Sequence, residues 1–209
     1  MDGAPPRLSA RARRRASQAS ALAAALWLAA ALPGAGAQPL QTKGGCRDGV
    51  PHGAWQLASQ DGSLRALGAF AKGKRTGSFI FWNAAGVRIA HIPYEEGEKN
   101  GTLALWYQTA AKGRDAQQRL EAVYSADRLN GFVRIWNPDG RVRGEYAYAA
   151  GRLAAARAWD GRGRELPEAQ ARQQAEKDTA AHEAYYDSLE ALVAAHLPAC
   201  DPYALPKPP

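Results

Sequence analysis

The chain has 209 residues, a formal charge of +7 and two cysteines. Residues 1–37 contain five arginines and one aspartate, so only +3 of that charge belongs to residues 38–209. A surface so weakly charged excludes nucleic acid as an expected partner and offers little attraction to anionic lipid. A length of this order favours one domain with its own core.

The first predicted element is a secretory signal peptide over residues 1–37. A basic start precedes an uncharged, Ala- and Leu-rich run at 21–32, and small residues follow at 35–37. This order is typical of a signal peptide cut between Ala37 and Gln38. The run has 12 residues, whereas a spanning helix needs roughly 20, so an uncleaved membrane anchor is the weaker alternative. We therefore expect a periplasmic or secreted protein with a Sec-type signal.

The two cysteines lie near the two ends of the exported part. Residues 38–48 form an N-terminal extension that carries Cys46, and Cys200 lies close to the C-terminus. An even pair in an oxidising compartment predicts a disulfide. It would close a loop of about 155 residues, for which the chain-entropy model gives about 5 kcal/mol. The alternative is two buried free thiols. Two isolated cysteines do not suggest a metal site.

Residues 49–166 repeat a unit of about 24 residues. A glycine anchors each unit, and successive anchors lie 24, 24 and 30 residues apart, because the third unit contains an insertion at 110–118. Nine residues after the anchor comes a turn glycine in the units without the insertion. Glycine supplies the positive φ that tight turns need. The repeat turn glycines are Gly53, Gly62, Gly77, Gly86, Gly101, Gly131 and Gly140.

Each unit holds two β-prone runs and therefore predicts one hairpin. The first run ends in tryptophan in three units, and the second ends in an aromatic residue at an equivalent position. Because an isolated hairpin is barely stable, stacked hairpins should share one apolar face. The sequence predicts a mainly β fold, an antiparallel β-meander of stacked hairpins. The aligned rings are Trp82, Trp106 and Trp136 in the first run and Tyr94, Tyr124 and Tyr148 in the second.

The repeat resembles the MORN-repeat family, in the bacterial variant with a period near 24 found in putative antitoxin components. The resemblance rests on Gly53-Ala-Trp55, Asp61-Gly62 and Gly73-Lys-Arg-Thr-Gly77, and it extends over residues 49–161, where a fifth unit with Asp160-Gly161 is truncated. The first unit lacks the later tryptophan, and the third carries the insertion. The resemblance implies an elongated β-meander without a catalytic centre.

Residues 167–197 predict one C-terminal helix, and residues 198–209 a Pro-rich tail. Pro167 suits a first helical position, and Pro198 ends the segment. We expect the helix to cap the array by covering its end or a face, since an open array needs a cover. The alternative is a homodimer or partner helix. The expected apolar stripe is Ala181, Tyr185, Leu189, Leu192, Val193 and Leu197.

The sequence shows no constellation that predicts catalysis. His182-Glu183 is half of a zinc-binding motif, but the second histidine is missing, so we expect His182 to be a solvated helix residue. Glu95, Glu96 and Glu98 share a turn, and the turn of the preceding unit is basic, which predicts ion pairing between units. We expect no enzyme activity, no cofactor and no metal.

These observations favour an exported, non-enzymatic scaffold for protein–protein interaction in the cell envelope. One face of the hairpin array would carry a ladder of the aligned tryptophans and tyrosines, residue types enriched at interface hot spots. The alternative is that these rings pack between the rungs. Two further hypotheses are an immunity or antitoxin-like protein, which follows from the resemblance, and an envelope protein that contacts lipid or glycan. The partner protein is not identified by the sequence.

Overall fold

The computed structural model describes residues 39–109 and 116–201. The expected signal peptide, most of the insertion and the last eight residues of the Pro-rich tail lie outside the described residues. Within the described residues the fold is mainly β, with one C-terminal helix, as the sequence predicts.

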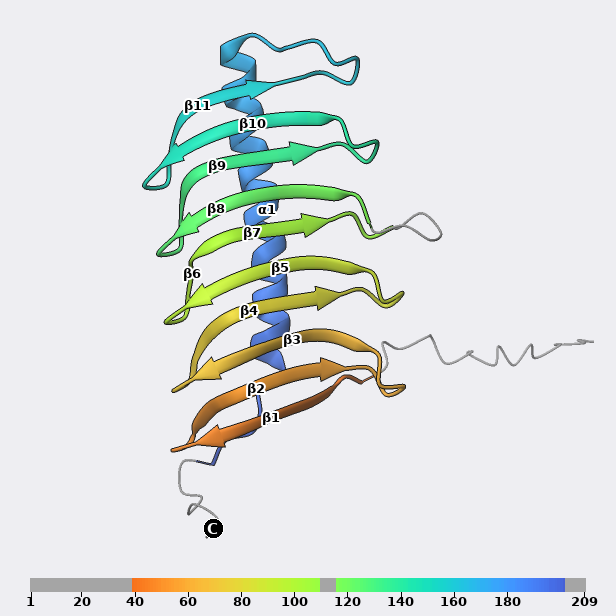
Figure 1. The fold of residues 1–209 in the computed structure, drawn as a ribbon, viewed down its shortest axis with the longest axis vertical. Helices are drawn as coiled ribbons and strands as arrows, with labels where there is room; N and C mark the ends of the chain where they lie inside the picture. Colours follow the sequence, from red (N-terminus) through yellow and green to blue (C-terminus); the bar gives the residue numbers. More distant parts are fainter. Residues whose placement is uncertain (1–38, 110–115, 202–209) are drawn as a thin grey trace, which may run out of the picture. The chain divides into compact units, whose positions relative to one another are not determined.

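The strands form one antiparallel sheet in which neighbours in sequence are neighbours in space (Figure 1). The path runs from β1 to β11 in chain order, and only the short β6 lies off it, paired with β5. The sheet is open, with β1 and β11 at its edges. The strands are β1 (Gln41–Arg47), β2 (Val50–Ala58), β3 (Leu64–Ala71), β4 (Lys74–Trp82), β5 (Arg88–Glu95), β6 (Glu98–Lys99), β7 (Gly101–Trp106), β8 (Gln118–Ser125), β9 (Arg128–Trp136), β10 (Val142–Ala149) and β11 (Arg152–Ala158).

Two kinds of turn alternate along the sheet. At one side, tight turns have positive φ at two successive residues, such as Lys72-Gly73 and Ala150-Gly151, the geometry of type I′ hairpins. At the other side, a wider turn closes when the N–H of its first residue donates to the carbonyl four residues later, as Asn137 does to Arg141. Of the glycines expected at turns, Gly62, Gly86 and Gly140 lie in the wide turns. The anchors lie in strands instead, although they too have positive φ: Gly53, Gly77, Gly101 and Gly131.

The truncated fifth unit uses a different turn glycine from the one the sequence suggests. The Asp160 N–H donates to the Arg164 carbonyl, and the Gly163 N–H donates to the Asp160 carbonyl. This is the pattern of the other wide turns, and Gly163 has φ +78°. Gly163, rather than Gly161, is therefore the counterpart of Gly140.

A β-bulge recurs beside each wide turn. In each case the second strand of the hairpin holds one residue that has no partner in the register of the first. A bulge places two consecutive side chains on the same face. The extra residue is Arg65 in β3, Ile89 in β5, Arg119 in β8 and Arg143 in β10.

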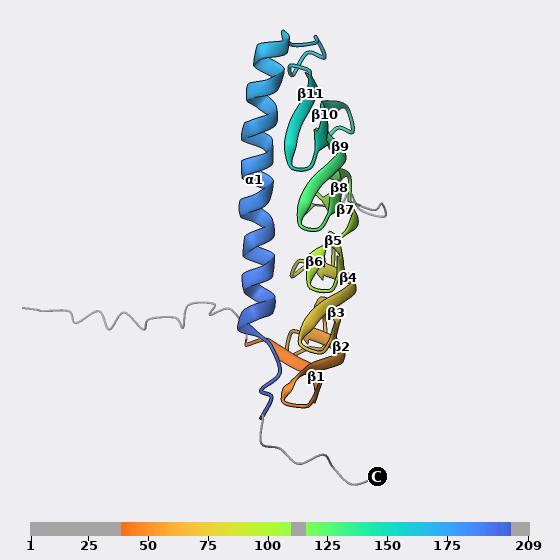
Figure 2. The ribbon, with the colours of Figure 1, turned by 90° about the vertical axis from the view of Figure 1, so that its left-hand side faces the viewer.

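The helix α1 (Glu168–Ala195) runs across the strands and covers one face of the sheet (Figure 2). Its 28 residues span about 42 Å at 1.5 Å per residue. The ten strands of the main path span about 43 Å at 4.8 Å per spacing. Of the two kinds of cover expected, the helix therefore covers a face and leaves the two edge strands in place as edges.

The core lies between α1 and the covered face. Its most deeply buried side chains include Phe79, Phe81, Leu103 and Leu105 from alternating positions of β4 and β7. The helix contributes Ala171, Ala175, Asp178, His182, Tyr186, Leu189 and Val193. Leu189 and Val193 belong to the expected stripe, whereas Leu197 is exposed. The buried stripe of the helix contains two polar residues, Asp178 and His182, so the apolar pattern alone did not identify it.

The predicted disulfide between Cys46 and Cys200 is confirmed, with a Cα–Cα distance of 5.6 Å. It joins β1, inside the segment expected to be an extension, to the residues that follow α1. Hydrogen bonds support the same junction, because Thr42 Oγ1 and Trp55 Nε1 both donate to the His196 carbonyl, at 2.9 and 3.1 Å. The last turn of the helix is thereby held against the first two strands.

Candidate functional site

The aligned tyrosines lie on the covered face, which corrects the expectation that they form an exposed ladder. Tyr94, Tyr124 and Tyr148 are only 5%, 5% and 8% exposed. Tyr148 shares a 2.7 Å hydrogen bond with Thr179 of the helix, and Tyr124 meets Tyr186 edge to face at 6.3 Å. These rings dock α1, because strand alternation at their positions points toward the helix.

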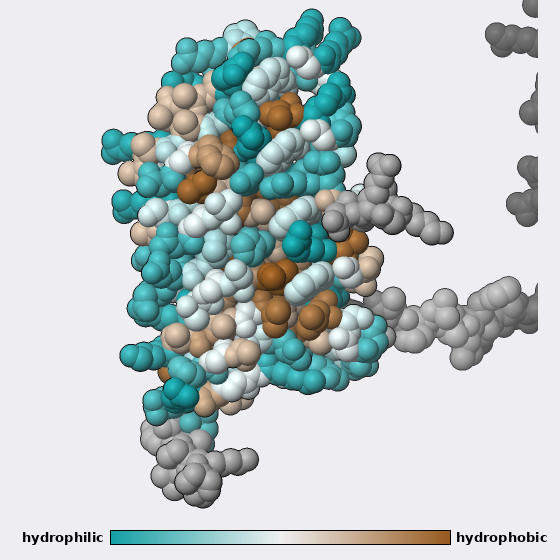
Figure 3. Space-filling view, in the orientation of Figure 1, coloured by the Kyte–Doolittle hydropathy of each residue, from teal (hydrophilic) through white to brown (hydrophobic). Residues whose placement is uncertain are grey.

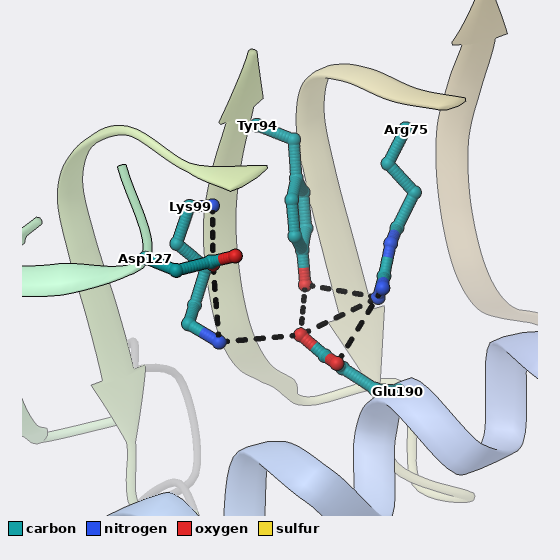
Figure 4. A network of polar contacts seen from close by, with 5 residues as sticks. All are labelled: Arg75, Tyr94, Lys99, Asp127 and Glu190. Atoms are coloured by element: carbon teal, nitrogen blue, oxygen red, sulfur yellow. Dashed lines mark hydrogen bonds and ion pairs between the residues drawn. The ribbon is translucent and has the colours of Figure 1, made fainter. Parts of the chain in front are cut away.

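Tyr94 belongs to a polar network around Glu190 of the helix (Figure 4). Its hydroxyl donates to Glu190 Oε1 at 2.9 Å. Arg75 and Lys99 approach the same oxygen at 3.4 Å each, and Lys99 also lies 3.5 Å from Asp127. Burial is the main cause that raises the pKa of Tyr94, so the ring stays a neutral donor. The network fixes the second half of α1 over β4, β5 and β6.

The basic and acidic turns of neighbouring units do meet. Lys74 Nζ lies 3.3 Å from Glu96 Oε2, and both side chains are exposed. Glu95 instead accepts a hydrogen bond from Asn100 within its own turn. The carboxylate cluster is thus part of turn and inter-unit pairing, as the charge pattern suggests.

The three tryptophans lie in equivalent places on the opposite face, here called the uncovered face. Trp82, Trp106 and Trp136 are each the last residue of a strand, directly beside a bulge, and each is half-buried. The Arg88 guanidinium lies 4.1 Å from the centre of the Trp106 ring. Their neighbours Phe81, Leu105 and Ile135 point into the core.

A continuous row of side chains crosses the uncovered face. Apolar side chains gather over β3 and β4 in Figure 3, where the row holds Leu67 and Ile80. Farther along, charges alternate, and Arg134 pairs with Glu145 at 2.9 Å. In cross-strand register the row is Leu67, Ile80, His91, Ala104, Glu121, Arg134, Glu145 and Arg157.

A cavity of about 410 Å³ opens between α1 and the C-terminal half of the sheet. It is here called the arginine cavity, because two of the bulge arginines line it. Asp178 stands in its wall and accepts hydrogen bonds from Tyr146 at 2.6 Å, from Gln174 at 3.0 Å and from Arg143. The lining residues are Tyr107, Arg119, Ile135, Arg143, Asp178, Ala181, His182 and Tyr185.

His182 is buried in this cavity wall, which corrects its expected place in solvent. It is 8% exposed, and its Nδ1 donates to the Asp178 carbonyl one turn earlier. Burial, and then the positive charge of Arg119, lower the pKa of His182 to about 4. The imidazole is therefore neutral at pH 7, with Nε2 left as an acceptor.

No protein-family model matches this chain, and no curated protein matches it. The described residues contain no group of three or more His, Cys, Asp or Glu side chains placed to hold a metal ion. Over the same residues, no helix combines the length and hydropathy required to cross a membrane.

Sequence reasoning missed the two cavity arginines, although the repeat contained a signal for them. Twelve residues after the anchor stand Arg65, Ile89, Arg119 (counting the insertion) and Arg143. An arginine stands at the same place in three of four hairpins, but strand alternation alone would point a side chain next to a buried residue toward solvent. Only the bulge, which a single sequence does not reveal, turns these side chains toward the helix.

Proposed function

We propose that this chain is a non-enzymatic scaffold that binds a protein partner in the cell envelope through the uncovered face of its sheet. The sheet is of the MORN-like kind, supported by the 24-residue spacing of its hairpins. The observation that carries the proposal is the asymmetry of the two faces. One face is filled by α1, while the other carries the three tryptophans and presents Leu67 at 36% and Phe132 at 47% exposure.

The size of the uncovered face suits such a role. Ten strands at 4.8 Å spacing and about 20 Å of strand length give roughly 860 Å². A stable protein–protein interface buries about 800 Å² on each partner. The apolar part of the face over β3 and β4 adjoins a charged part over β8 to β11, and interfaces likewise combine apolar and polar areas.

Two of the tryptophan rings, Trp106 and Trp159, argue against a sugar ligand. The Arg88 guanidinium covers one side of Trp106, and the Arg157 guanidinium lies 5.1 Å from the centre of the Trp159 ring. A sugar would need an open ring side on which to stack. A protein partner, by contrast, can use both the guanidinium and the edge of the indole.

Two leucines provide a matched test of the proposal. Leu67 on the uncovered face and Leu197 after the helix are 36% and 42% exposed. The full chain, exported in cells, would carry a photo-crosslinking amino acid at either position. We expect a discrete adduct of defined mass from position 67 only, abolished in a chain that also carries Trp106→Ala. Equal adducts from both positions, or none from position 67, would contradict the proposal.

A further inference from the structure

The bulge arginine of the first unit has a hydrogen-bond acceptor in the next strand. Arg65 Nε donates to the carbonyl of Trp82, the last residue of the next strand, at 3.2 Å. The contact satisfies a side-chain donor that the bulge turns toward the protein interior. In the second unit the position is taken by Ile89, which needs no acceptor.

Arg119 does not make the equivalent hydrogen bond. The equivalent carbonyl belongs to Trp136, and it accepts a hydrogen bond from the Tyr107 hydroxyl at 2.8 Å. Arg119 Nε is buried and has no hydrogen-bond partner among the described residues. Its guanidinium lies 4.7 Å from the centre of the Tyr185 ring. Tyr107 therefore occupies, in this unit, the carbonyl acceptor that Arg65 uses in the first unit.

Arg143 lines the same cavity, and not all of its N–H donors have an acceptor among the described residues. One of its terminal nitrogens bonds Asp178, but its Nε is also buried without a partner among the residues described. Asp178 already accepts from Tyr146 and Gln174. The arginine cavity is therefore lined by two guanidinium groups against one carboxylate. Each guanidinium also keeps a buried Nε without an acceptor among the described residues, which is costly.

We propose that the arginine cavity binds a small organic monocarboxylic acid, whose carboxylate accepts hydrogen bonds from Arg119 and Arg143. The apolar part of the ligand lies against Tyr107, Tyr185 and Ile135. The site is distinct from the uncovered face, because it lies between α1 and the covered face.

Size and charge both favour this class of ligand. A cavity of about 410 Å³ falls in the usual range for small-molecule sites, about 300–1,000 Å³. The two arginines stand in β8 and β10, two strands apart, so their backbones are roughly 10 Å apart. This separation leaves room for one carboxylate between the long side chains. Asp178 offsets one of the two positive charges, which suits a monoanion better than a phosphate.

Benzoate is a suitable probe, with benzamide as its neutral counterpart and inorganic phosphate as an anion without an apolar part. The full chain would be titrated with each, following the Nε–H resonances of Arg119 and Arg143 by NMR and the heat of binding by calorimetry. We expect benzoate to shift both resonances, with a dissociation constant of about 1 mM or tighter. Benzamide and phosphate should bind much more weakly.

Two arginine variants locate the site. Arg119→Gln should weaken benzoate at least about tenfold, because a charged hydrogen bond is lost. Arg88→Gln is the matched control, since Arg88 also stacks on a ring but lies on the uncovered face, and it should bind benzoate as the wild type does. The inference is overturned if benzamide or phosphate equals benzoate, if benzoate does not bind, or if the two variants behave alike. Should Arg119→Gln not fold, the wild-type comparison of benzoate with benzamide still decides.

Discussion

Loss of the Cys46–Cys200 disulfide should be the largest single perturbation of stability. The bond spans a sequence separation of 154, and closing such a loop is worth about 5 kcal/mol in the chain-entropy model. Thr42 and Trp55 still hold the end of the helix without the bond, so the native state is kept and the loss comes from the freer unfolded chain. We expect Cys46→Ser with Cys200→Ser to lower the free energy of unfolding by about 2–5 kcal/mol.

Urea titration followed by circular dichroism measures this loss. With a slope of about 2 kcal/mol/M, the midpoint should fall by about 1–2.5 M, and the slope should rise because the unfolded chain expands. Wild type in reductant should match the double variant. An unchanged midpoint with full reduction would refute the reasoning, since it would mean that the unfolded chain is equally restricted without the bond.

Three further predictions concern single positions. The pKa of His182 is lowered to about 4 from 6.5 by burial; the unfolded chain therefore binds a proton that the fold excludes. Stability should be full above about pH 6.5 and fall by roughly 3 kcal/mol toward pH 4, and urea titrations of His182→Gln across this range should lack that component. Ala150 has φ +48° before Gly151, so Ala150→Asn should raise the free energy of unfolding by about 0.5–1 kcal/mol; a thermal melt no higher than wild type would contradict this. A Cβ at Gly68 would stand 2.5 Å from the Phe79 ring, so Gly68→Ala should cost about 1–3 kcal/mol in a urea titration, and a neutral result would show that the ring can move aside.

The parts of the fold that the sequence predicts are those set by local chemistry. Gly62, Gly86 and Gly140 mark the wide turns because those turns need positive φ at that place. The single cysteine pair leaves one disulfide partner for each member. The spacing of the units predicts hairpins in chain order, and the sheet has that order.

The parts that were missed depend on contacts between distant segments. Both faces of the sheet carry aromatic residues, so composition alone could not assign Tyr94 or Tyr148 to the side of the helix. His182 and Asp178 look solvated in a helical pattern, because their burial depends on partners in β10 and on backbone bonding. The hydrogen bond from Tyr107 to the Trp136 carbonyl, which takes the acceptor equivalent to that of Arg65, joins segments that are distant in sequence.

The length of α1 matches the width of the sheet, so a change in the number of hairpins requires a change in the length of the helix. One more hairpin would widen the sheet by about 9.6 Å, and the helix would need about six more residues to reach across it. Duplicating a 24-residue unit alone would leave Cys46 out of reach of Cys200. The length of the helix therefore limits the number of repeats. The disulfide can form only in chains whose sheet and helix have the same span.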